Sequence, residues 1–100
     1  MGEYGQRETI LRADAMQWRE RVSADMTSAA GRAALIEHRI SAEAVAAAAD
    51  RIASYVAAGG VLIEVCSGRA RRAAKFLEAR RMIERIKGDL VRPIGIRAGA

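Results

Sequence analysis

The residues best suited to chemistry in this chain are the small turn Ser67-Gly68 and the arginines after it, Arg69, Arg71 and Arg72. The first turn of a helix presents unpaired backbone N–H groups and the positive end of the helix dipole. Guanidinium groups at the same place add full positive charge and can grip a phosphate at two points. The pattern therefore predicts a site for a phosphate or another anion at this helix start.

The helix expected from about Arg69 to Lys87 gathers its basic side chains on one side and its apolar side chains on the other, toward a core. Contacts with phosphates along such a side would position a nucleic acid without reading its sequence. With about five phosphates neutralised, log K should fall with log salt at a slope near −4 to −5. The residues predicted to contact the DNA or RNA backbone are Ser67, Gly68, Arg69, Arg71, Lys75, Arg81 and Arg85.

The distribution of charge along the sequence also favours an anion-binding surface in the C-terminal part of the chain. Residues 1–60 hold seven Lys and Arg against eight Asp and Glu, a net charge of −1. Residues 61–100 hold ten Lys and Arg against four Asp and Glu, a net charge of +6. An arginine-rich half of this kind is typical of a surface for a polyanion, although a solvated helix face would also be basic.

The spacing of Cys66 and Arg72 offers a second, more distant reading. The two are separated by five residues, as in the signature loop of protein tyrosine phosphatases. There, loop N–H groups hold the phosphate, the arginine braces its oxygens, and nearby cations lower the pKa of the thiol. We prefer the interpretation that Cys66 is a small apolar side chain at the end of a buried strand.

The N-terminal part of the chain suggests a different function. A helix is expected from near Gln6 to Met26, with an apolar stripe at four-three-four spacing. Residues 1–30 are therefore expected to form an amphipathic extension to a single α+β domain at residues 31–100. In this alternative the protein is a structural or interaction subunit, and its basic helix meets an acidic protein partner. The residues expected to dock on the partner are Leu11, Trp18 and Val22, although Trp18 also suits a packing anchor.

The remaining elements define the fold class. Ser41 is expected to cap a helix that ends at Gly59-Gly60, and strands are expected at residues 61–66 and 90–97. Residues 33–40 could form either helix or strand. This order predicts an α+β fold, with helices packed on a small mixed sheet of two or three short strands.

The stretch from Ile63 to Ala70 is a strand that leads into a Gly-Arg-Ala turn and then a helix. It resembles the second strand and second helix of the Alba superfamily of nucleic-acid-binding proteins. The resemblance covers residues 35–99 and requires a first strand near residue 35, followed by His38-Arg39 in place of the family's basic pair. It implies a dimeric α+β domain that binds duplex DNA or RNA, with Arg69 touching the backbone.

Composition excludes several other classes. One cysteine and one histidine allow neither an internal disulfide nor a cysteine-based zinc site, so we expect no metal and no cofactor. They also leave little for a metallohydrolase or a serine-histidine hydrolase, so we favour a non-enzymatic protein over the phosphatase-like alternative. No apolar run approaches the roughly 20 residues that span a bilayer, and no secretory signal is visible, which favours the cytoplasm. Apolar residues make up 51% of the chain but aromatic residues only 4%, so the core is thin and homo-oligomerisation is expected.

Overall fold

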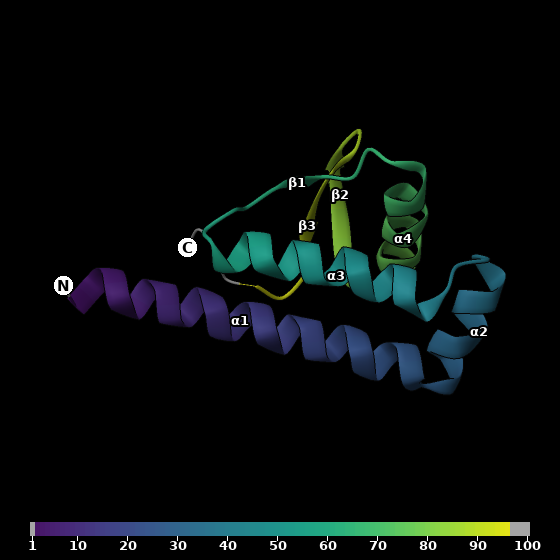
Figure 1. The fold of residues 1–100 in the computed structure, drawn as a ribbon, viewed down its shortest axis with the longest axis horizontal. Coiled ribbons are helices and arrows are strands. Elements are labelled where there is room, and N and C mark those ends of the chain that lie inside the picture. The colour runs from purple at the N-terminus through teal and green to yellow at the C-terminus, as the bar shows by residue number, and fades with distance from the viewer. Residues whose placement is uncertain (1, 97–100) are drawn as a thin grey trace.

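Four helices and a three-stranded sheet make up the computed structural model, which describes residues 2–96 and, of these, the side chains of residues 10–96 (Figure 1). The long helix α1 runs beside α3, α2 joins them at one end, and α4 stands across the end of α3 next to the sheet. In chain order the elements are α1 (Gly2–Thr27), α2 (Ala29–Glu37), α3 (Ala42–Ala57), β1 (Ile63–Glu64), α4 (Gly68–Ala79), β2 (Ile83–Lys87) and β3 (Leu90–Pro93). The predicted α+β class is confirmed.

Serine hydroxyls begin three of the helices. In each case the side chain accepts a hydrogen bond from the backbone N–H three residues later, which satisfies one of the donors that a helix start leaves unpaired. The capping residues are Ser28 for α2, Ser41 for α3 and Ser67 for α4. The cap predicted at Ser41 is confirmed, and Ser67 defines the start of the basic helix.

The same three helices end in one kind of motif. Each is followed, after one intervening residue, by a position with positive φ: Arg39 at 52°, Gly59 at 98° and Arg81 at 60°. After α4, the N–H of Met82 donates to the carbonyl of Leu77 at 2.8 Å, and the N–H of Arg81 donates to that of Glu78 at 3.0 Å. This is the Schellman arrangement, which closes a helix by turning one residue left-handed.

The end of α4 corrects one prediction. A single helix was expected from Arg69 to Lys87, but the helix stops at Ala79 and residues 83–87 form β2. The expectation was wrong because β2 has a partner strand, whose hydrogen bonds outweigh a weak local preference for helix. Arg81 and Arg85 therefore do not belong to the basic side of α4.

The sheet is antiparallel throughout, rather than mixed, and has the order β1-β3-β2. In the central strand Val91 is the register partner of Ile63 on one side and of Arg85 on the other. The pairing of β2 with β3 shifts between Arg85 and Lys87, as in a β-bulge. The two-residue turn Gly88-Asp89 joins these strands and brings Asp89 close to the basic residues of β2.

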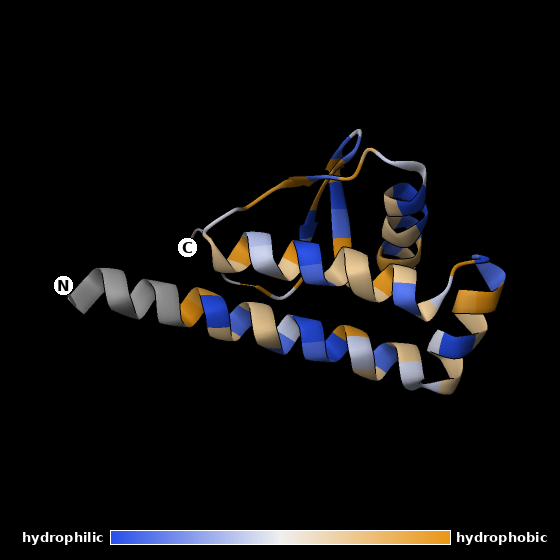
Figure 2. Cartoon of the chain, viewed as in Figure 1, coloured by the Kyte–Doolittle hydropathy of each residue, from blue (hydrophilic) through white to orange (hydrophobic). Residues whose placement is uncertain are grey.

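The core contains side chains from α1, from the later helices and from the sheet. Its largest fully buried side chains include Trp18 of α1, Ile52 of α3 and Phe76 of α4, together with Ile83 and Val91 of the sheet. The indole N–H of Trp18 donates to the carbonyl of Met82 at 2.8 Å, so the packing role expected for this residue is confirmed. Figure 2 shows hydrophobic segments alternating with hydrophilic ones along α1 and α3, as amphipathic helices require.

The N-terminal helix is part of this core and not an extension outside it. Trp18 and Val22 pack in the same cluster as Phe76 and Val91. The guanidinium of Arg80, just beyond α4, also donates to both carboxylate oxygens of Asp25 in α1, at 2.9 and 2.7 Å. These contacts leave no boundary near residue 30, because the apolar stripe of α1 meets later elements of its own chain.

Residues 33–40 were predicted to form either helix or strand. Most of them belong to α2, which ends at Glu37. The first strand that the Alba resemblance requires near residue 35 is therefore not formed. Ile36, in the middle of that expected strand, lies on the outer side of α2 with 80% of its surface exposed. None of the helices in the described part of the chain is both long and apolar enough to cross a membrane.

Candidate nucleic-acid interface

The helix α4 has one buried side and one exposed side. Its buried side is formed by Ala73, Ala74, Phe76 and Leu77. The outermost line of the exposed side has helical spacing of four, three and four residues, and consists of Gly68, Arg72, Lys75 and Ala79. Two cations therefore stand in the middle of this line, with a small residue at each end.

A hollow of about 410 Å³ separates this side of α4 from the β2–β3 hairpin. Its lining contains four cationic side chains and only two carboxylates, those of Glu78 and Asp89. The cations are Arg71, Arg72 and Lys75 from the helix and Arg85 from β2. An excess of positive charge on the walls of a concavity concentrates the field and favours an anion.

Two of the arginines in this hollow already have acidic partners. Arg71 donates to Asp89 at 3.0 Å, and Arg85 lies 3.4 Å from Glu78 and 4.0 Å from Asp89. The hydrogen bond to Asp89 and the charge of that carboxylate raise the pKa of Arg71 further above its usual value. The Arg71 side chain is nevertheless 55% exposed, so a phosphate could reach it while the ion pair persists.

The structure brings together four of the seven residues predicted to contact a nucleic acid: Gly68, Arg71, Lys75 and Arg85. Ser67 is adjacent, but its hydroxyl is used to cap α4. Arg69 is exposed on the first turn of α4, outside the lining of the hollow. Arg81 lies just beyond the C-terminal end of α4 and does not line the hollow.

Two features of this site were not found from the sequence. Asp89 was not expected among the arginines, because the predicted helix ran past residue 83 and left no hairpin beside it. The turn after α2 also approaches α4: Arg72 donates to the carbonyl of Arg39 at 3.5 Å, and the ring of His38 packs edge-on against Phe76 with centroids 5.9 Å apart. The backbone of Arg39 therefore adjoins the basic side of α4.

The environment of Cys66 differs from the preferred interpretation. Its side chain is exposed in the loop before α4 and is not buried at the end of β1, because β1 ends two residues earlier. The guanidinium of Arg72, which a phosphatase loop would use to brace a phosphate, donates to the Arg39 carbonyl at 3.5 Å and remains exposed. Cys66 is therefore an exposed thiol next to the serine that caps α4.

The three residues expected to dock on a protein partner are buried in the core of their own chain. Leu11 is 7% exposed, Trp18 is fully buried and Val22 is 1% exposed. The apolar stripe that they form is covered by α3 and by the residues around β2 and β3. The physical reason is that a sheet this small needs the apolar side of a long helix to complete its core.

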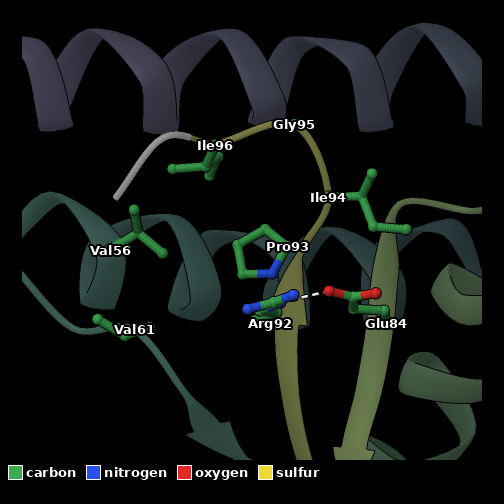
Figure 3. Close-up of a pocket in the computed structure, with 8 residues that line it drawn as sticks. All are labelled: Val56, Val61, Glu84, Arg92, Pro93, Ile94, Gly95 and Ile96. Carbon is green, nitrogen blue, oxygen red and sulfur yellow. Dashed lines mark hydrogen bonds and ion pairs between the residues drawn. The ribbon is translucent and has the colours of Figure 1, made fainter. Parts of the chain in front are cut away.

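A second hollow, of about 350 Å³, lies beyond the other end of β3 (Figure 3). Apolar side chains, among them Val56 and Ile96, form much of its wall. Its two charged residues, Arg92 and Glu84, form an ion pair with each other. Since that pair neutralises itself, the lining points to no particular class of ligand.

Among the described residues, no group of three or more histidine, cysteine or carboxylate side chains is placed to hold a metal ion. Comparison with protein-family models, with curated proteins and with solved structures found no match to this chain. Its function must therefore be inferred from the geometry and charge of the α4 surface alone. We call Arg69, Arg71, Arg72, Lys75 and Arg85 the basic surface.

Proposed function

We propose that this protein binds the phosphate backbone of a nucleic acid through the basic surface. The observation that supports this most strongly is the hollow between α4 and the hairpin, in which four cations face two carboxylates. Arg72 and Lys75 stand on the outermost line of α4 and take no part in the core. Long cationic side chains that face solvent around a concavity are the usual means of holding phosphates.

The arrangement also limits the number of phosphates held. Arg71 and Arg85 are partly neutralised by Asp89 and Glu78. We therefore expect about four phosphate contacts and a slope of log K against log salt near −3.6. This slope is shallower than the sequence alone predicted, because the acidic residues of the hairpin turn and of α4 lie among the arginines.

Substitution of one cation at a time tests the proposal. Arg72→Gln and Lys75→Gln should each weaken binding of a labelled duplex of about 20 base pairs and reduce the salt slope by about 1. Fluorescence anisotropy at several salt concentrations measures both quantities. Arg12→Gln is the matched control, since it removes one exposed charge from α1, and it should leave affinity and slope unchanged.

Two results would contradict the proposal. The first is the lack of measurable binding by the unaltered protein at about 50 mM salt, where contacts with phosphates are strong. The second is an equal loss of affinity in the Arg12 variant and the two α4 variants, which would mean that overall charge, and not the basic surface, attracts the nucleic acid.

A further inference from the structure

The shape of the basic surface distinguishes between kinds of nucleic acid. Its central element is a helix that packs on the molecule by one side only, through Ala73, Ala74, Phe76 and Leu77. An α-helix with its side chains is about 10–12 Å across. The major groove of B-form DNA is about 12 Å wide and admits such a helix, whereas that of an A-form RNA duplex is too deep and narrow.

The outermost line of α4 suits entry into a groove. Gly68 and Ala79 at its ends are small and exposed, and a Cβ added at Gly68 would meet nothing within 4 Å. Arg72 and Lys75 between them would reach the bases or the phosphates at the groove edges. In Figure 1 α4 stands on one side of α3, between the β2–β3 hairpin and α2, and α1 runs along the opposite side of α3.

The surroundings of α4 are poor in aromatic surface. Proteins that bind single strands stack bases on exposed aromatic rings. In the part of the chain whose side chains are described, Trp18 and Phe76 are fully buried, and the exposed Tyr55 lies on α3 against Gly60. The ring of His38 is half-buried and already packed against Phe76. The basic surface thus offers charge and shape to a nucleic acid, but no stacking platform.

We infer that the partner is duplex DNA in the B form, with the exposed side of α4 in the major groove and the β2–β3 hairpin against the adjacent backbone. This inference rests on the proposed function and narrows it to one kind of nucleic acid. Arg85 on the hairpin and Lys75 on the helix line opposite walls of one hollow. Arg85 is therefore placed to contact a phosphate at the edge of the groove while α4, which carries Lys75, occupies the groove.

A comparison of three ligands of one sequence tests the inference. The 100-residue chain is titrated into a labelled DNA duplex of about 20 base pairs, the matching RNA duplex and one of the DNA strands alone, all at about 50 mM salt. We expect the DNA duplex to bind at least about tenfold more tightly than either other ligand, since both lack the groove that α4 fits. Equal or tighter binding of the RNA duplex or of the single strand would overturn the inference and leave the proposed function standing. Failure to bind any of the three would overturn both.

Ligands that occupy one groove test the docking mode. Methyl green, which lies in the major groove, should compete with the protein for the DNA duplex, whereas netropsin, which fills the minor groove, should not. Competition by netropsin alone would overturn the placement of α4. Arg72→Gln should weaken binding to the DNA duplex more than to the RNA duplex, and Arg12→Gln should change neither. An equal effect of Arg72→Gln on both duplexes would show that this residue does not enter a groove.

Discussion

Asp89 controls the charge available on the basic surface. Its carboxylate accepts a hydrogen bond from Arg71 at 3.0 Å and lies 4.0 Å from Arg85, so one acid serves two arginines from different elements. Its backbone carbonyl accepts a hydrogen bond from Val65, which ties the hairpin turn to the segment after β1. The side chain therefore sets the charge of the hollow, while the backbone of the same residue holds the turn in place.

The substitution Asp89→Asn should strengthen binding to a nucleic acid. It removes a negative charge from the hollow and releases Arg71 and Arg85 for phosphates, while the backbone hydrogen bond of residue 89 is kept. We expect a gain of up to about tenfold at low salt and a steeper salt slope. Anisotropy titrations measure both, with Glu20→Gln on α1 as the control that removes a distant exposed carboxylate. An affinity that is unchanged or lower in the Asp89→Asn variant, with an unchanged melting temperature, would show that phosphates do not enter this hollow.

At the scale of elements, the position at which α4 ends determines which basic residues lie on this helix and which lie on β2. Arg81 adopts a φ of 60°, which closes the helix and allows the chain to return as β2. A left-handed conformation is strained for a residue with a Cβ and free of strain for glycine. This arginine thus fills a position that helices usually give to glycine.

Replacement of Arg81 by glycine should therefore stabilise the protein by about 0.5–1 kcal/mol. The measurement is the midpoint of urea unfolding followed by circular dichroism. The control is Ala79→Gly, a substitution in the last turn of the same helix. It should lower the free energy of unfolding by a similar amount. A lower midpoint for both variants would mean that residue 81 is not left-handed in solution. Because Arg81 lies outside the hollow, its removal should also leave the affinity for a nucleic acid nearly unchanged.

At the scale of the whole molecule, α1 holds the C-terminal half in place. It supplies Trp18 to the core, and its carboxylate Asp25 receives the Arg80 guanidinium. Near the other end of the hairpin, Arg21 donates to the carbonyl of Ile94 at 2.8 Å, and Figure 3 shows the segment from Ile94 to Ile96 beside this helix. Because α1 and the later elements share one core in the described part of the chain, we expect them to unfold together.

A chain that begins at residue 31 should not fold. It would lack Leu11, Trp18, Val22 and Met26, all of them buried. Loss of one buried tryptophan alone costs about 3–5 kcal/mol, and the whole stability of a small domain is about 5–15 kcal/mol. Circular dichroism and a thermal scan should show no cooperative transition for residues 31–100, with the full chain as the control. A cooperative transition in the fragment would restore the division into a domain and an extension.

The sequence by itself determined the elements whose signals are local. The serine cap at Ser41, the stop at Gly59-Gly60 and the apolar spacing through Trp18 lie within a few residues of the structure that they specify, and all three are present. The same holds for the small turn at Ser67-Gly68, which begins α4. Capping and helical spacing act between neighbours in the chain, so they can be recognised without knowledge of the fold.

Only the tertiary structure decided how these elements meet. Residues 83–87 form a strand because β3 offers them hydrogen bonds, and α4 ends early because Arg81 turns left-handed. The stripe of α1 covers the core of its own chain, where Trp18 packs in one cluster with Phe76 and Val91. Asp89 lies among the arginines because the β2–β3 hairpin folds back beside α4. Such pairings depend on residues far apart in sequence, and no local pattern encodes which distant segment will supply the partner.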